Sequence, residues 1–129
     1  MPVELKMLAW SMLLGLVYFL IATTLVTLQR GLAWNASNRE GESKPLTGVT
    51  GRSDRAFKNF LETFVFFVAA VLAVVVAQRT NASTALGAQL FFWARVVYLP
   101  VYLIGIPYLR TLVWATSLAG LFMVVFGLF

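Results

Sequence analysis

The chain of 129 residues is too apolar for a soluble domain of its size, because 60% of its residues are hydrophobic and its mean hydropathy is +0.85. It contains no cysteine and no histidine, which excludes disulfides, a thiolate nucleophile and the commonest metal ligand, so no metal site is expected. The net charge of +5 gathers around one loop and does not indicate nucleic-acid binding. Any chemistry must use carboxylates, tyrosines, arginines or lysines, or a reactive group that a cofactor brings in.

Four apolar runs are each long enough to cross a bilayer, which takes about 20 helical residues. They cover residues 5–28, 56–77, 84–106 and 111–129. The first run is too long for the apolar part of a secretory signal and has no small-residue cleavage site, so we expect it to remain in the mature protein. The sequence predicts an all-α membrane protein: one domain, residues 1–129, forming a bundle of four transmembrane helices.

The loop predicted for residues 29–55 is the only sizeable polar segment. Six of the ten basic residues lie in it or at its edges, namely Arg30, Arg39, Lys44, Arg52, Arg55 and Lys58. The positive-inside rule therefore places this loop in the cytoplasm and both termini on the other side. Its glycines and Pro45 predict turns rather than regular structure, and Ser53 or Asp54 is expected to cap the second helix near Arg55. Its charge also suits contact with anionic lipid headgroups.

The second apolar run begins with the motif Arg55-x-x-x-Asn59-x-x-Glu62. On a helix these side chains fall within about 60° of one face, and Glu62 lies about 10 Å from the cytoplasmic end. Lys58 precedes Glu62 by one helical turn and could pair with it. The motif predicts a polar face below the headgroups.

The third run carries Arg95, Tyr98 and Tyr102, again within about 60° of one helical face. Arg95 lies inside an apolar stretch and cannot lose its proton, so it must find partners in a low-dielectric environment. Intramembrane ionisable residues usually mark a pathway, a ligand site or a paired network. The short connection at residues 78–83 makes the second and third helices antiparallel neighbours, so we expect the two polar faces to meet at one depth.

Arg110 stands where the fourth helix begins, after Pro107. A cation beside the positive end of a helix dipole is unfavourable by about 0.3–1 kcal/mol, but the same arrangement suits the binding of an anion. Thr111 adds a hydroxyl nearby. Pro100 is expected to kink the third helix without ending it.

Simpler interpretations exist for each of these residues. Glu62 could form a structural salt bridge with Arg95 or Arg55, and Tyr98 and Tyr102 could only fill space. Arg30 and Arg110 could be ordinary interfacial side chains. The tryptophans are expected to be packing or interface-belt residues: Trp10, Trp34, Trp93 and Trp114.

Together these residues resemble the family of membrane-associated proteins in eicosanoid and glutathione metabolism (MAPEG). The matching text is Gly51-Arg52-Ser53-Asp54-Arg55-Ala56-Phe57-Lys58-Asn59-Phe60-Leu61-Glu62, then Ala94-Arg95-Val96-Val97-Tyr98, Tyr102 and Leu109-Arg110-Thr111. Chain length, four spans and a basic first loop agree as well. The flank Pro45-Leu46-Thr47-Gly48 is similar to the bacterial branch, which implies a bacterial inner membrane.

The resemblance implies a homotrimer that binds glutathione between neighbouring subunits in the cytoplasmic half. By position, Arg55 and Asn59 would bind the polar backbone and carboxylates of glutathione, and Glu62 its amino group. The other implied site residues are Tyr98 and Tyr102 lining the pocket, Arg95 binding the ligand beside them, Arg110 stabilising the thiolate, and Arg30 contributed by a neighbouring chain.

Two functions follow as hypotheses. The first is a glutathione-dependent membrane transferase or peroxidase acting on a lipophilic electrophile, with Arg110 as the catalytic residue. The alternative is a non-catalytic membrane scaffold, a lipid-binding protein or an accessory subunit of a larger membrane complex. A channel is not expected, because one buried arginine and one carboxylate per subunit do not make a conduction path.

Overall fold

The computed structural model describes residues 1–42 and 44–129, and every regular element in this part of the chain is a helix. Four of the five helices are long and apolar enough to cross a membrane, which confirms the four predicted spans. In chain order the helices are α1 (Val3–Arg30), α2 (Leu32–Ala36), α3 (Gly48–Val76), α4 (Ala82–Ile104) and α5 (Pro107–Phe126).

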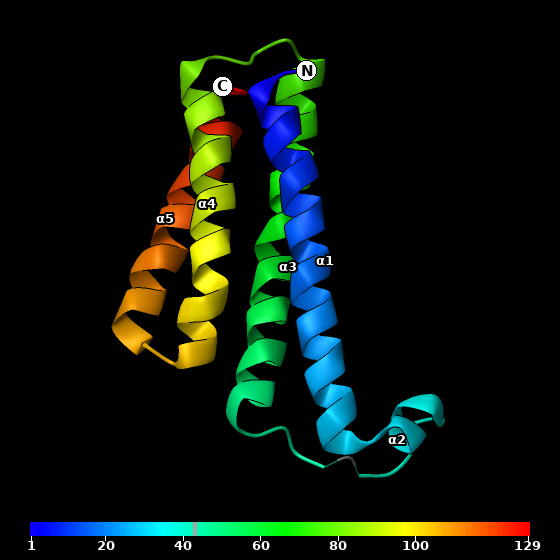
Figure 1. The fold of residues 1–129 in the computed structure, drawn as a ribbon. Coiled ribbons are helices and arrows are strands. Elements are labelled where there is room, and N and C mark those ends of the chain that lie inside the picture. Colours follow the sequence, from blue (N-terminus) through cyan, green and yellow to red (C-terminus); the bar gives the residue numbers. More distant parts are fainter. Residues whose placement is uncertain (43) are drawn as a thin grey trace.

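The bundle consists of two antiparallel pairs, with α1 beside α3 and α4 beside α5 (Figure 1). Both ends of the chain lie at one end of the bundle, and α2 with the long basic connection lies at the other. The four spans therefore return the chain to the side on which it started.

Helix α3 begins earlier than the sequence predicts. Its N-cap is Thr47, in extended conformation, whereas the hydroxyl of Ser53 donates to the carbonyl of Thr50 inside the helix, 2.8 Å away. The expected cap at Ser53 or Asp54 is therefore wrong. Hydropathy marks where a helix enters the apolar layer, and α3 continues beyond that point through polar turns. The first loop also contains the short helix α2, so it is not formed only of turns.

Aromatic stacking joins the helices along the core. The rings of Phe67 on α3 and Phe91 on α4 stack with centroids 4.0 Å apart, and those of Tyr18 on α1 and Phe60 on α3 with centroids 4.7 Å apart. Such pairs contribute about 0.5–1.5 kcal/mol each beyond the burial of their area. They fix α3 between α1 and α4, and so fix the face that α3 presents to the rest of the bundle.

Helices α4 and α5 approach closely at a pair of glycines. A Cβ atom built on Gly87 would lie 2.6 Å from the carbonyl oxygen of Gly120, and one built on Gly120 would lie 2.5 Å from the carbonyl oxygen of Gly87. Small residues allow such approach between membrane helices. This contact joins the second half of α5 to the first half of α4, toward the end of the bundle that carries both chain ends.

The two ends of α4 are also fixed. Asn81 forms a capping box with Thr84, whose hydroxyl donates to the buried carboxylate of Glu4 on α1, 2.6 Å away. At the other end, Gly105 adopts a left-handed conformation with φ +89°, and Arg52 Nε donates to the carbonyl of Leu103 at 3.0 Å. Pro100 lies within α4 without ending it, as the sequence predicts.

Candidate functional site

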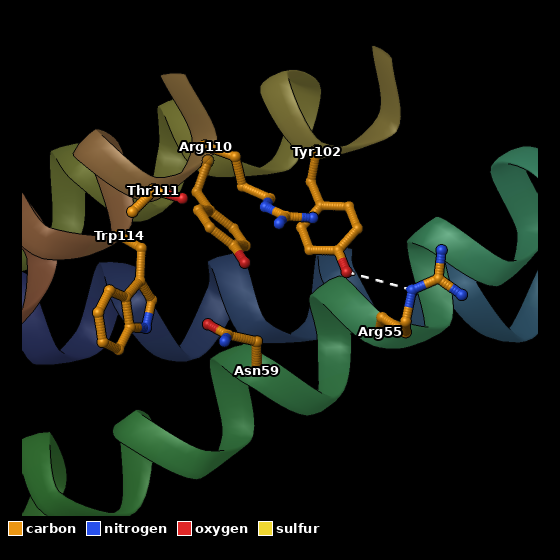
Figure 2. A pocket seen from close by; sticks show the side chains of 7 residues that line it. Arg55, Asn59, Tyr102, Arg110, Thr111 and Trp114 are labelled. Carbon is orange, nitrogen blue, oxygen red and sulfur yellow. Dashed lines mark hydrogen bonds between the residues drawn. The ribbon is translucent and has the colours of Figure 1, made fainter. Parts of the chain in front are cut away.

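A polar pocket opens between α3, α4 and α5 near the end of the bundle that carries the basic connection (Figure 2). Its volume is about 340 Å³. Small-molecule sites usually measure roughly 300–1,000 Å³. The lining residues are Arg55, Asn59, Tyr98, Tyr102, Arg110, Thr111 and Trp114. Five of these seven belong to the residues that the sequence analysis selected for the site, so the two polar faces and the start of α5 meet in one place.

Tyr102 organises one side of the pocket. Its hydroxyl oxygen accepts a hydrogen bond from Arg55 Nε at 3.2 Å, drawn as a dashed line in Figure 2. The guanidinium of Arg110 lies over the face of the same ring, 4.8 Å from its centroid. A cation over an aromatic face gains about 0.5–1 kcal/mol at an exposed site and more when desolvated. The phenol ring thus holds two arginines, one at its edge and one on its face, at the mouth of the same pocket.

Arg95 lies behind the pocket wall rather than in it. The side chain is fully buried, and its two terminal nitrogens donate to Asn59 Oδ1 at 2.7 Å and to Thr63 Oγ1 at 2.9 Å. The guanidinium lies 4.9 Å from the ring centroid of Tyr98. The backbone carbonyl oxygen of Arg95 accepts a hydrogen bond from the Tyr18 hydroxyl at 2.6 Å. Arg95 therefore links α1, α3 and α4 and touches the pocket through Asn59 and Tyr98.

The carboxylate of Glu62 makes neither of the salt bridges considered from the sequence. Across residues 1–42 and 44–129, the one ion pair joins Lys58 to Asp54 at 3.0 Å. The expected pairing of Lys58 with Glu62 is wrong because Lys58 turns back to Asp54, and an acid one turn before a base is the better orientation on a helix. Glu62 is exposed on α3 and is not among the residues that line the pocket.

Arg30 also lies away from the pocket of its own chain. It lines a second pocket of about 220 Å³ between α1, α2 and α3, together with Trp34 and Asp54. Its Nε donates to the carbonyl of Lys44 at 3.0 Å. Within a single chain, Arg30 and Glu62 are thus separate from the cluster around Tyr102.

Sequence reasoning missed three residues of this region. Trp114 was expected only to pack or to lie in the interface belt, yet it lines the pocket. The signal was available, because Trp114 follows Arg110 by one helical turn and shares its face. Thr63 follows Asn59 by one helical turn and gave the same kind of signal, whereas Tyr18 gave none. Tyr18 binds a backbone carbonyl on another helix, and no spacing pattern reveals such a contact.

The lining of the pocket is rich in hydrogen-bond donors. It includes two guanidinium groups, hydroxyls from tyrosine and threonine and an indole N–H, and it includes no carboxylate. The first turn of α5, which carries Arg110, has Ile106 as its N-cap and so no side-chain cap. Helix N-termini leave backbone N–H groups unpaired and favour negative charge. This arrangement suits an anionic ligand that is rich in acceptors.

A model of the MAPEG family matches residues 7–129, nearly the whole chain. The chain belongs to the MAPEG family. This family includes glutathione transferases and related membrane proteins. Comparisons with curated proteins and with solved structures gave no match. Family membership and the four apolar helices together make this an integral membrane protein whose outer surface contacts lipid.

Proposed function

We propose that this MAPEG protein is a glutathione-dependent transferase or peroxidase that acts on a lipophilic electrophile reaching the site from the bilayer. The observation that carries the proposal is the donor-rich pocket in which Arg55 and Arg110 are held by the same phenol ring. Glutathione has carboxylates for these cations to bind. It also supplies the thiol that a chain without cysteine lacks.

Arg110 has the properties needed to activate a thiol. A thiol is a weak nucleophile until a nearby cation stabilises its thiolate and lowers its pKa. Arginine keeps its charge throughout, so it stabilises the thiolate without exchanging a proton. Stacking on Tyr102 fixes the guanidinium while leaving its N–H groups available at the rim of the ring. Arg55 and Asn59 then bind the carboxylate and carbonyl oxygens of the ligand.

The proposal includes a homotrimer in which neighbouring chains complete each site. Glu62 supports it: the carboxylate is exposed on a transmembrane helix and has no ion-pair partner among the described residues. Such a group is costly in lipid and calls for a partner. In the trimer Glu62 would receive the ammonium group of glutathione, and the partner subunit's Arg30 would add a further cation. The basic connection would face the cytoplasm of a bacterial cell and both termini the opposite side of the inner membrane.

The direct test is binding and turnover with the purified protein in detergent. We expect calorimetric heat with glutathione and a rise in melting temperature, because a ligand at 100 times its Kd stabilises the folded state by about 2.7 kcal/mol. We also expect conjugation of chlorodinitrobenzene or reduction of cumene hydroperoxide. Absence of heat, of thermal stabilisation and of both activities would contradict the proposal.

A non-catalytic scaffold, lipid-binding protein or accessory subunit of a larger membrane complex is the competing function. The buried network around Arg95 favours it, because the Arg95 side chain joins three helices while lying behind the pocket wall. Under this alternative, Arg95→Leu disrupts the assembly while glutathione leaves the melting temperature of the wild type unchanged. The same thermal measurement therefore separates the two functions.

A further inference from the structure

The contact between Arg95 and Asn59 determines which way the Asn59 amide faces. A guanidinium has only donors, so the amide atom 2.7 Å from its terminal nitrogen has to be the oxygen. The amide nitrogen of Asn59, with its two N–H groups, is then left for the pocket that Asn59 lines. Because the guanidinium cannot accept a hydrogen bond, the oxygen of the Asn59 amide must face Arg95.

Arg95 is itself held too firmly to release the amide. Its other terminal nitrogen donates to Thr63 Oγ1, and the Thr63 hydroxyl gives its own proton to the carbonyl of Phe60 at 3.2 Å. Thr63 therefore acts toward Arg95 only as an acceptor. The ring of Tyr98 lies against the guanidinium, and Tyr18 holds the carbonyl of Arg95. Contacts from three helices fix the side chain that orients Asn59.

The charge of Arg95 acts in the same direction. The described residues provide no ion pair to it, and its Nε has no hydrogen-bond partner among them. A buried guanidinium without an ion-pair partner makes its surroundings favourable for negative charge. Asn59 lies between this cation and the pocket.

We propose that Arg95 is a positioning residue that fixes Asn59 as a hydrogen-bond donor, so that this part of the pocket selects a carboxylate or carbonyl oxygen of the ligand. The proposal rests on the proposed function, which makes glutathione the ligand. It replaces direct contact between Arg95 and the ligand, since the Arg95 side chain is fully buried.

Asn59→Asp tests the inference because it keeps the shape of the side chain. It replaces the amide nitrogen, which donates toward the pocket, with a carboxylate oxygen, which only accepts. The new carboxylate pairs with Arg95, so the melting temperature should stay unchanged or rise. Its second oxygen faces the pocket as an acceptor, so glutathione affinity measured by calorimetry should fall by at least about tenfold. Wild-type affinity in this variant, or a melting temperature that falls together with affinity, would overturn the proposal.

Asn81→Asp is the matched control. It makes the same change of charge at the opposite end of the bundle, at a helix N-cap where aspartate and asparagine serve equally well. Its glutathione affinity should equal that of the wild type. A tenfold loss in the control as well would attribute the effect to net charge and overturn the proposal.

A double-mutant cycle separates positioning from general support of the fold. Glutamine at position 95 offers both a donor and an acceptor, so Arg95→Gln frees the amide and weakens glutathione binding. In an Asn59→Ala background, Arg95→Gln should cause no further loss of glutathione affinity. With Asn59 present, Arg95→Lys should bind glutathione more tightly than Arg95→Gln does. Additive losses would overturn the inference. Absence of glutathione binding by the wild type overturns the proposed function as well, whereas equal binding by wild type and the Asn59→Asp variant overturns this inference alone.

Discussion

Tyr102 gives the two pocket arginines different tasks. Arg55 uses its Nε to donate to the phenol oxygen, whereas Arg110 stacks on the ring face and spends no N–H group on the contact. Among the described residues, the Arg110 guanidinium donates no hydrogen bond, so its donors are available for a ligand while the ring restrains its direction. That combination is what stabilisation of a developing anion requires, because donors set in advance need no reorganisation when the charge appears.

Replacement of Arg110 tests whether this residue stabilises the developing anion. Arg110→Ala should lower kcat for conjugation by about 100-fold, the effect of removing one pre-positioned donor to an anion. Arg110→Lys keeps the charge but loses the planar contact with Tyr102, so its kcat should lie between those of the wild type and the alanine variant. Steady-state kinetics with varied glutathione checks both. An unchanged kcat in Arg110→Ala would remove Arg110 from the reaction.

At the level of elements, the site depends on the contact between α4 and α5. Tyr98 and Tyr102 come from α4 and Arg110 from α5, so the distance between these helices decides whether the guanidinium reaches the ring. Gly87 and Gly120 bring the two helices into backbone contact at the other end of the pair, and from this contact α5 extends toward the site. Arg52 contributes from α3 by bonding the carbonyl of Leu103, just before the turn between the two helices.

Gly120→Ala should destabilise the protein by about 1–3 kcal/mol, the usual cost of inserting volume into a closed contact. The new Cβ would lie 2.5 Å from the carbonyl oxygen of Gly87, so α5 has to move. The free energy of unfolding in detergent and the melting temperature measure the loss. Ala119→Val, at an exposed position on the same helix, is the control and should change stability little. Equal effects of the two substitutions would show that the glycine contact does not hold α5.

The sequence predicts the elements better than it predicts their ends and their partners. Long apolar runs determine the four spans because the bilayer imposes their length. Hydropathy does not predict the start of α3, because polar helical turns precede its apolar run. Helical spacing correctly groups Arg55 with Asn59 and Tyr98 with Tyr102, because spacing fixes which residues share a face. Spacing does not predict the partner of Arg95, because that partner depends on the distance between helices. Nor does it predict the partner of Lys58, because Asp54 and Glu62 both lie one turn away and Lys58 pairs with Asp54.

At the scale of the whole molecule, the orientation in the membrane decides from which side a ligand such as the proposed glutathione would reach the pocket. Because the chain contains no cysteine, a single introduced cysteine can be labelled without background. A maleimide that cannot cross membranes should label Thr80→Cys in intact spheroplasts. Ser37→Cys, in the basic connection, should react only after permeabilisation. The reverse pattern would place the basic connection outside, and the proposed cytoplasmic site with it.

The return of both ends of the chain to one end of the bundle allows the proposed trimer to be tested in a single polypeptide (Figure 1). Successive copies can be joined head to tail by a short soluble linker, with no extra segment crossing the lipid. A tandem polypeptide of this kind can carry Arg110→Ala in a chosen copy alone. Its turnover then shows whether catalytic centres work independently, losing rate in proportion to the altered copies, or whether one silent centre stops them all.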